Sequence, residues 1–357
     1  GSATGEDLAE LHLHGGRAVI TAVETVLAAR EGFRRAEAGE FTRRAFANGR
    51  IDLAEAQGLA DLLAAETEFQ RRAALAMAGG VLSRKVDKWR EETLLLSAQV
   101  EAVLDFEDEG DVGALSAEFD SVLQALAADL RGNLAAPHAE TLREGYRVVL
   151  AGPPNAGKST LFNALIDSEA AITAPKAGTT RDVLVRPVAI AGVPFSFVDT
   201  AGLREDSSDD VEVIGIDRAR AELARADLVL WLGPEAAVPA GAWNIDAQID
   251  RSGHIAKHDP DFRVSAITGQ GMADLKRALV DHAMLAIPGP GEAALDARQR
   301  DLLNEAAVAL EGAHRSGDLL LLAEQLRFAR LAFDRLSGRA STEDMLDTLF
   351  GRFCIGK

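Results

Sequence analysis

The sequence is poor in cysteine, in aromatic residues and in basic charge. Its 357 residues include one Cys, one Tyr and 5% aromatic residues, with 38 Lys and Arg against 56 Asp and Glu. A single Cys excludes an intrachain disulfide framework, and no apolar run approaches the roughly 18 residues of a membrane span. The net charge of −18 excludes a generic basic nucleic-acid coat, because phosphate binding requires a concentrated positive face. We therefore expect a cytoplasmic protein of two or three domains, without a membrane anchor, in which any RNA contact is local.

Three kinds of sequence pattern follow one another along the chain. Residues 53–142 are rich in Ala, Leu and Glu at helical spacing, which predicts long helices. From Tyr146, short β-branched runs at 147–151, 183–190, 193–198, 227–232 and 262–266 are separated by Gly and Pro, and helical patterns lie between several of them. This alternation is typical of an α/β domain with a mainly parallel sheet. Ala191-Gly192 between two runs predicts a tight hairpin, and hence one antiparallel strand at the sheet edge.

A helical pattern of apolar residues begins again after the linker Pro288-Gly289-Pro290-Gly291. Apolar residues at intervals of three or four then predict one buried helix face; they are Leu319, Leu322, Leu326, Ala329, Phe333 and Leu336. The economical arrangement is an α/β P-loop domain inserted into an α-helical domain, preceded by a partial α+β N-terminal domain. The predicted boundaries are 1–52 for the N-terminal domain, 53–144 and 291–357 for the two helical halves, and 145–290 for the inserted domain.

Residues 152–159 match the phosphate-binding pattern G-x-x-x-x-G-K-[ST], directly after an apolar strand and directly before a helical pattern. The backbone N–H groups of such a loop, here including those of Ala156, Gly157 and Thr160, can surround phosphates at a helix N-terminus. Lys158 brings a positive charge to the β- and γ-phosphates, and the Ser159 hydroxyl can ligate Mg²⁺. The alternative, a chance Gly-rich turn, does not account for the flanking strand and helix.

Two further segments are spaced as nucleotide-sensing switches. Asp199-Thr200-Ala201-Gly202 follows a strand, so Asp199 can hold the Mg²⁺ shell and the Gly202 N–H can approach the γ-phosphate. Between this segment and the phosphate loop lies Gly178-Thr179-Thr180-Arg181-Asp182, in which Thr180 can complete the metal shell. The alternative for these stretches is a polar turn and an acidic loop.

The guanine-reading pattern N-K-x-D is not intact. Its best match is Ala247-Gln248-Ile249-Asp250, in which Asp250 can accept hydrogen bonds from guanine N1 and N2, but the bracing Asn and Lys are missing. Ser265-Ala266 resembles the loop whose backbone N–H meets guanine O6. About 18 residues separate Leu232 from Asp250, fewer than the usual strand, helix and strand need. Either the domain has lost an element or guanine binding is weakened.

Together these motifs resemble translation-factor-type GTPases and, more narrowly, the MnmE (TrmE) family of tRNA-modification GTPases. The narrower resemblance rests on four stretches: P-N-A-G-K-S at 154–159; D-T-A-G-L-R at 199–204 with V-E-V-I-G at 211–215; G-E-F-T, R-A-F and N-G-R-I-D-L between 39 and 53; and the terminal F-C-I-G-K at 353–357. The resemblance covers essentially the whole chain, although the family's first β-rich portion is largely absent here.

The resemblance implies a GTP hydrolase that acts as a homodimer with an MnmG-type FAD-containing protein, in a heterotetramer, on tRNA. The implied reaction adds an aminomethyl or carboxymethylaminomethyl group to C5 of the wobble uridine. It uses GTP, Mg²⁺, K⁺ and a tetrahydrofolate derivative, either 5-formyl- or 5,10-methylene-tetrahydrofolate. Hydrolysis is expected to accompany K⁺-dependent association of two GTPase domains.

The resemblance also implies roles for single residues: Asn155 and Thr179 as K⁺ ligands, Glu212 as the residue that orients the attacking water, Glu10 and Arg50 in folate binding, and Cys354 in tRNA modification but not in hydrolysis. Without the family, Glu212 belongs to an acidic, solvated loop. A lone Cys is usually a small buried hydrophobe. The arginines between positions 30 and 50 fit either an anionic partner or a solvated face balanced by glutamates.

Two other functions fit parts of the pattern. A nucleotide-switched binding module, such as a ribosome-assembly GTPase, is expected to carry a basic RNA-binding appendage, which the acidic helical segments do not provide. A degenerate scaffold that does not hydrolyse nucleotide would account for the altered guanine motif.

Overall fold

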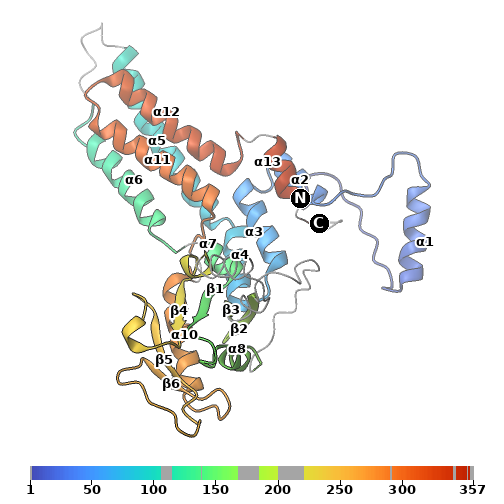
Figure 1. Ribbon diagram of the computed structural model, residues 1–357. Coiled ribbons are helices and arrows are strands. Elements are labelled where there is room, and N and C mark those ends of the chain that lie inside the picture. The colour runs from blue at the N-terminus through green and yellow to red at the C-terminus, as the bar shows by residue number, and fades with distance from the viewer. Residues whose placement is uncertain are drawn as a thin grey trace, which may run out of the picture. The chain divides into compact units, whose positions relative to one another are not determined.

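The computed structural model of the chain describes residues 2–105, 115–137, 139–167, 185–199, 221–289, 292–340, 343–351 and 353 (Figure 1). It divides into two compact units. The helical unit comprises Gly1–Ala64, Ala74–Ala135 and Arg298–Lys357, and the sheet unit comprises Ala65–Ala73 and Ala136–Ala297. Because the chain leaves the helical unit and later returns to it, the predicted insertion of an α/β domain into a helical domain is confirmed.

The sheet unit alternates strands and helices along the chain. Its elements are α7 (Ala139–Glu144), β1 (Tyr146–Ala151), α8 (Lys158–Ile166), β2 (Val185–Ile190), β3 (Val193–Asp199), β4 (Leu228–Trp231), the 3-10 helix η3 (Glu235–Ala237), β5 (Trp243–Ala247), β6 (Phe262–Val264) and α10 (Met272–Ala286). The strands form one sheet in the order β2-β3-β1-β4-β5-β6. All described pairs are parallel except β2 with β3, which confirms the predicted antiparallel edge strand.

One face of this sheet packs against α8 and α10. Alternate residues of β1, namely Tyr146, Val148 and Leu150, share a buried cluster with Leu161 of α8 and Leu279 of α10. Side chains of a strand alternate between faces, so a run such as 146–151 that is buried on both faces reads as continuously apolar. The packed sheet leaves the carboxyl ends of β1, β3, β5 and β6 at one edge, where their connecting loops carry the predicted site residues.

The connection from β4 to β5 explains the short spacing in the sequence. Among the described residues 232–242 there is no α-helix, and the short 3-10 helix η3 takes its place. The Lys257 side chain ties this region together, because its Nζ donates to Asn244 Oδ1 at 2.7 Å and to the Trp231 carbonyl at 3.5 Å. Burial lowers the pKa of the Lys257 ammonium group. The interval thus contains one strand, β5, which was not among the predicted runs, and the usual element that it lacks is a helix.

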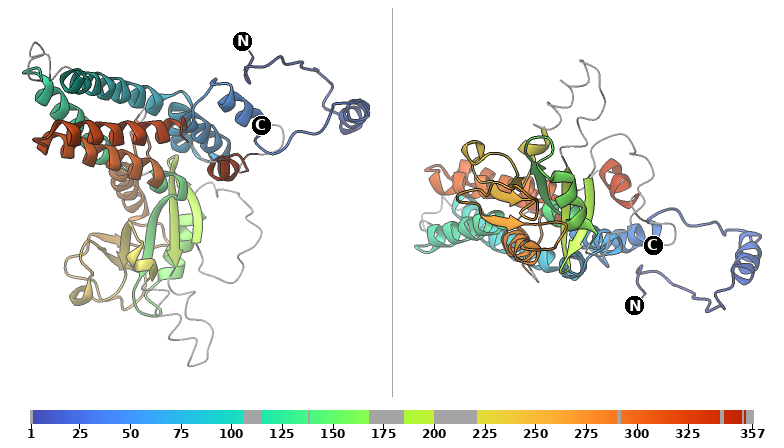
Figure 2. Two further views of the ribbon diagram at one scale, coloured as in Figure 1. Left: turned by 90° about the horizontal axis from the view of Figure 1, so that it is seen from above. Right: turned by 60° about the horizontal axis from the view of Figure 1, so that its bottom comes forward.

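The helical unit consists of helices that vary in length from one to several turns. They are α1 (Arg17–Ala28), α2 (Glu40–Ala47), α3 (Leu53–Ala64), α5 (Val81–Asp105), α6 (Phe119–Leu134), α11 (Ala297–Arg315), α12 (Leu319–Ser337) and α13 (Glu343–Phe350), while α4 (Glu68–Ala78) passes from the sheet unit into the helical unit. In both figures α5, α6, α11 and α12 lie side by side as a bundle (Figure 2).

The predicted apolar stripe of α12 is buried in this bundle from Leu322 to Leu336, while Leu319 at its start is half-buried. Phe333 is fully buried, and its ring lies 6.1 Å from that of Trp89 in α5. Next to this contact, Arg90 Nε and Asp334 Oδ1 are 2.7 Å apart, and the Trp89 indole N–H donates to Asp129 Oδ2 at 2.7 Å. Residues from 81–105 and 319–337 thus pack together despite their distance in the sequence, as predicted for the two helical halves.

A smaller core joins α2, α3 and the end of the chain. Leu53, Phe350 and Phe353 are buried in it, and Phe46 and Ile51 pack against them. Gly39 allows this close packing: it has φ 71°, and a Cβ atom there would lie 2.2 Å from the Phe350 carbonyl oxygen. None of the described helices is both long enough and apolar enough to cross a bilayer.

Candidate nucleotide-binding site

The phosphate loop runs from the end of β1 to the start of α8. Its backbone takes left-handed or otherwise positive φ at Gly152 (146°), Asn155 (61°) and Gly157 (90°). A Cβ atom at Gly152 would lie 3.0 Å from the backbone nitrogen of Gly233, so glycine is required there by both conformation and space. Asn155 tolerates positive φ better than most residues with a Cβ. These glycines let the chain curl at the N-terminus of α8, as anion binding requires.

The two polar side chains at the start of α8 occupy different environments. Lys158 is 6% exposed, and its ammonium group donates to the carbonyls of Gly152 at 3.0 Å and Pro153 at 2.8 Å. This places the charge across the mouth of the loop. Ser159 Oγ donates to Asp199 Oδ2 at 2.7 Å, and Asp199 is 2% exposed at the end of β3.

Ser159 and Asp199 fit the oxygen chemistry of Mg²⁺. A hydroxyl and a buried carboxylate lie within hydrogen-bond distance of each other at the end of the phosphate loop. Mg²⁺ is usually held by one or two such protein oxygens together with substrate phosphates and water. Among the described residues no group of three or more His, Cys, Asp or Glu side chains is arranged for a metal ion.

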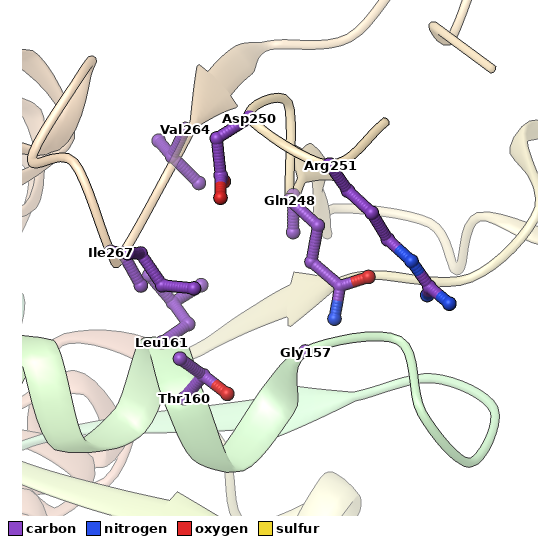
Figure 3. A pocket seen from close by; sticks show the side chains of 10 residues that line it. Gly157, Thr160, Leu161, Gln248, Asp250, Arg251, Val264 and Ile267 are labelled. Atoms are coloured by element: carbon purple, nitrogen blue, oxygen red, sulfur yellow. The ribbon is translucent and has the colours of Figure 1, made fainter. Parts of the chain in front are cut away.

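A pocket of about 240 Å³ adjoins the phosphate loop (Figure 3). Its lining comes from α8, from the end of β5 and from the loop after β6: Gly157, Thr160, Leu161, Ala247, Gln248, Asp250, Arg251, Val264, Ala266 and Ile267. Ile267 and Gln248 lie on opposite sides of it, and the Asp250 carboxylate points into the space between them. The result is a slot with mostly uncharged walls and one carboxylate, next to a phosphate-binding loop. We call it the base slot.

Short turns at the strand ends position the polar groups of the base slot. After β5, the Arg251 N–H donates to the Gln248 carbonyl at 3.0 Å, which closes a tight turn with Asp250 inside it. After β6, Ser265 is fully buried, and its hydroxyl accepts the Thr268 N–H at 3.0 Å. The structure therefore brings Asp250 and Ala266 to the same pocket as the phosphate loop, although about a hundred residues separate them from it in the sequence.

Six lining residues were not predicted from the sequence as site residues: Leu161, Ala247, Gln248, Arg251, Val264 and Ile267. Gln248 occupies the position of the Lys in N-K-x-D, and the absence of that Lys is one of the departures that indicate either a lost element or weakened guanine binding. Ile267 directly follows Ser265-Ala266, so its position next to a predicted site segment was the only signal in the sequence that could have indicated its place in the pocket. Arg251 carries no motif of its own, and in Figure 3 its side chain extends along the outer side of Gln248.

Family models match nearly the whole chain. Residues 53–354 match the MnmE helical domain, and residues 1–50 match the N-terminus of the GTP-binding protein TrmE. The chain belongs to the MnmE family. The family resemblance seen in the sequence is thus confirmed, together with the fold class that it implies.

Named relatives in the MnmE family are close. The tRNA modification GTPase MnmE of Novosphingobium aromaticivorans is 60% identical over 367 residues, covering 100% of this chain and 84% of that protein. The protein of the same name from Erythrobacter litoralis is 62% identical over 356 residues, with the same coverage. Among solved structures, the G domain of the T. maritima FeoB iron transporter is 26% identical and covers 38% of this chain and 98% of that one, with a TM-score of 0.28.

In the segment that matches the TrmE N-terminus, Glu10 and Arg50 occupy different surroundings. The Glu10 side chain is 77% exposed, and its carboxylate lies 3.7 Å from the His12 imidazole. Arg50 lines a polar cavity of about 530 Å³ together with residues of α3, α5 and the end of α12. No hydrogen bond or ion pair joins Glu10 and Arg50 among the described residues, so their shared role in folate binding stays a prediction.

The arginines between positions 30 and 50 of this MnmE-family chain are largely paired with carboxylates. Arg34 lies 2.7 Å from Glu40 and lowers the pKa of that carboxyl to about 2. Other pairs are Arg35 with Glu24, Arg43 with Asp347, and Arg44 with Glu6 and Glu40. These pairs favour the balanced, solvated face over a free anion-binding patch.

Several predicted site residues lie outside the described part of the chain: Thr179, Thr180, Gly202, Glu212 and Cys354. Their roles in metal binding, hydrolysis and tRNA modification stay predictions. The other predicted site residues of the sheet unit are described and form two groups. Around the phosphate loop lie Asn155, Ala156, Gly157, Lys158, Ser159, Thr160 and Asp199. Around the base slot lie Asp250, Ser265 and Ala266.

Proposed function

We propose that this chain hydrolyses GTP and acts in tRNA modification, as the names of its MnmE-family relatives say of those proteins. The observation that carries the proposal is the base slot, which places one carboxylate beside a complete phosphate loop. Guanine presents two donors, N1–H and N2–H, to a carboxylate, whereas adenine presents an acceptor at N1. Asp250 therefore favours guanine even though the Asn and Lys of the usual motif are replaced.

The phosphates and Mg²⁺ are assigned to the loop between β1 and α8. Lys158 exchanges its two loop carbonyls for phosphate oxygens, which carry more negative charge. Ser159 and Asp199 hold the ion, with Thr180 as the proposed additional ligand and the Gly202 N–H against the γ-phosphate. The bound ion supplies charge stabilisation of the transferring phosphoryl group.

The decisive measurement is nucleotide affinity for GTP, GDP and ATP under the same conditions. A hydrogen bond to a charged group contributes about 1.5–3 kcal/mol, so two such bonds to Asp250 predict guanine nucleotides that bind about 10²-fold or more tightly than ATP. Equal affinity for GTP and ATP would reject guanine specificity. Turnover of GTP in the same preparation would exclude the scaffold that does not hydrolyse nucleotide.

The finer mechanism that we propose uses K⁺ and a catalytic glutamate. Asn155, at the positive-φ position of the loop, and Thr179 would ligate K⁺ when two GTPase domains of a homodimer associate, and Glu212 would orient the attacking water. A monovalent cation beside the phosphates stabilises the charge that develops in the transition state. GTP hydrolysis measured in K⁺ and in Na⁺ tests this: equal rates at saturating GTP would reject the role of K⁺.

The proposed modification chemistry lies in the helical unit. We assign a tetrahydrofolate derivative to Glu10 and Arg50, and C5 modification of the tRNA wobble uridine to Cys354, together with an MnmG-type flavoprotein in the cytoplasm. One structural fact supports this grouping: Phe353, directly before Cys354, is buried in the small core against which Ile51, the neighbour of Arg50, packs. Phe353 is thus packed close to the segment that carries Arg50.

A Cys354→Ser variant separates modification from hydrolysis. We expect normal GTP turnover and a loss of wobble-uridine modification when the variant replaces the native protein in a deficient cell. Full modification by the variant would remove the proposed role of Cys354, while the assignment of the nucleotide site would stand.

A further inference from the structure

The strand β5 buries two polar side chains on the face of the sheet that lies away from α8 and α10. Trp243, Ile245 and Ala247 pack against the core cluster that contains those two helices. Because side chains alternate along a strand, Asn244 and Asp246 lie on the opposite face, where they are 6% and 1% exposed. Helices usually cover both faces of a parallel sheet. Here the contacts of these two side chains come mainly from the loop between β5 and β6.

The Asp246 carboxylate contacts this loop at two places. Its Oδ1 lies 2.9 Å from His254 Nε2, and its Oδ2 accepts the Lys257 N–H at 3.3 Å. Arg263 of β6 adds a positive charge, with its Nε 3.7 Å from Oδ2. The His254 distance allows an ion pair with the protonated ring, although the buried Nε2 has no directed hydrogen bond among the described residues. Asp246 is therefore buried opposite basic side chains, which offset the cost of burying its charge.

The contact between Asp246 and His254 closes a ring of chain around the base-reading carboxylate. From Asp246 the backbone runs through Asp250 and returns to Asp246 through the His254 side chain. Within this ring, the Arg251 carbonyl accepts the His254 N–H at 3.0 Å, directly after the turn that contains Asp250. Asp250 thus lies in a segment that is held at both ends, and Figure 3 shows its side chain directed into the base slot.

We propose that Asp246 and His254 are positioning residues that hold the loop after β5 so that Asp250 faces guanine. This inference rests on the proposed nucleotide site and extends it, because it assigns part of the guanine preference to a contact outside the pocket. Neither residue lines the base slot. Their effect reaches the nucleotide through the orientation of Asp250.

The physical basis is that a fixed carboxylate loses less conformational freedom when the base binds. Residues 251–253 of the ring have exposed side chains, so packing does not hold this part of the loop. The contact at its far end then restricts the directions that Asp250 can take. A carboxylate that already faces N1–H and N2–H can accept from both donors. Without the contact, the bond that needs the more precise direction should be lost first.

Two substitutions at position 254 test this contact. His254→Leu removes the ring nitrogens and keeps an apolar side chain, whereas the amide of His254→Gln can reach Asp246 with a donor. His258→Leu, which alters an exposed histidine of the same loop, is the matched control. Affinities for GDP, inosine diphosphate and ADP are measured by titration of each nucleotide-free protein. Inosine diphosphate lacks the N2 amino group of guanine and keeps the rest of the nucleotide.

The ratio of affinities for GDP and inosine diphosphate reports the direction of Asp250. In the native chain we expect GDP to bind about tenfold or more tightly, because it offers one more donor to the carboxylate. In His254→Leu this ratio should fall to about threefold or less, while His254→Gln and the control keep it. A variant that is only less stable binds both nucleotides more weakly by the same factor. A native ratio in His254→Leu, equal losses in the Leu and Gln variants, or a native ratio of one would overturn the inference.

Asp246→Asn tests the other end of the contact. It keeps an acceptor for the Lys257 N–H and removes the negative charge beside His254. We expect a lower ratio for this variant as well. Because both substitutions break one contact, Asp246→Asn combined with His254→Leu should lower the ratio no further than the more damaging single substitution. Additive losses would show that the two residues act independently and would overturn the inference.

A failure of the proposed function gives a different result. Equal affinity of the native chain for GDP and ADP would reject guanine specificity, whatever residue occupies position 254. The contact is then decided by hydrogen exchange of the backbone amides of residues 249–254 in the nucleotide-free protein. His254→Leu should speed this exchange by about tenfold, and His254→Gln and His258→Leu should not. Unchanged exchange in His254→Leu would overturn the inference even if the protein binds guanine nucleotides as proposed.

Discussion

The two units of this chain differ in which structural features determine their geometry. In the sheet unit, the described residues that we propose for nucleotide binding lie at or next to short loops at strand ends, where single glycines and positive φ angles decide the geometry. In the bundle of the helical unit, long helices such as α5 and α12 bury apolar stripes, so the packing of side chains decides the structure. A substitution in the first unit should therefore change ligand binding with little effect on stability, and a core substitution in the second should do the reverse.

The largest expected effect tests the helical side of this comparison. Phe333→Ala removes a fully buried ring next to Trp89, so we expect the free energy of unfolding of the helical unit to fall by about 3–5 kcal/mol. Thermal unfolding measures the loss. The matched control is Phe328→Ala in the same helix, where the ring is 46% exposed. This substitution should lower the free energy of unfolding by less than about 1 kcal/mol. A loss of GDP affinity that matched the loss of stability would break the separation between the units.

Lys158→Ala tests the phosphate side of the sheet unit. Removing the positive charge from the mouth of the loop should reduce GTP turnover by about 10²-fold or more, because the charge on the transferring phosphates loses a fixed partner. Steady-state hydrolysis gives the rate. Lys88→Ala, which alters an exposed lysine paired with Glu92 on α5, should hydrolyse GTP normally. Turnover retained in Lys158→Ala would place hydrolysis elsewhere.

Asp250→Asn tests the base side with a smaller effect. An amide in place of the carboxylate loses the charged acceptor for N1–H and N2–H, so GDP affinity should fall by about tenfold to 10²-fold. Xanthosine diphosphate, whose C2 oxygen can accept from the new amide, should bind the variant more tightly than it binds the native chain. Asp259→Asn, an exposed carboxyl on the loop after β5, serves as the control. An unchanged preference for guanine in Asp250→Asn would contradict the assignment.

The smallest effect concerns a partly buried carboxylate of the helical unit. Burial raises the pKa of Glu55 above its ordinary value of 4.5, although Glu55 Oε2 accepts the Asp52 N–H at 2.8 Å. The folded state then binds this proton more tightly than the unfolded state, so stability is lost as the pH rises through the window just above 4.5.

Glu55→Gln removes that charge and keeps an oxygen for the Asp52 N–H. We expect a gain in the free energy of unfolding at pH 7 of less than about 1 kcal/mol, and a flatter dependence on pH in the window named above. Denaturant unfolding at a series of pH values measures both. Glu101→Gln on the exposed side of α5 should alter neither, and destabilisation by Glu55→Gln at pH 7 would show that the charge is favourable where it lies.

The sequence predicted the parts of the fold whose signals are local. The phosphate loop, the hairpin at Ala191-Gly192 and the stripe of α12 were all readable because their patterns occupy a few neighbouring residues. The strand β5 was not predicted, since its residues, W-N-I-D-A, carry two polar side chains that are buried by tertiary contacts. The base slot could be predicted only in part. Gln248 gains its contacts from a loop about ninety residues earlier, which no local pattern reports.

The lost helix between β4 and β5 has a consequence for how the sheet unit opens. The described pairing of β4 with β5 consists of Leu230 with Trp243 and Trp231 with Asn244, and β6 has three residues. Because this connection has few ladder bonds and no α-helix, we expect the half of the sheet that carries Asp250 to open locally before the half that carries β1 and β3. A bound guanine would then serve as a missing structural element, and backbone amides of β5 and β6 should exchange with solvent deuterium far more slowly once nucleotide is present.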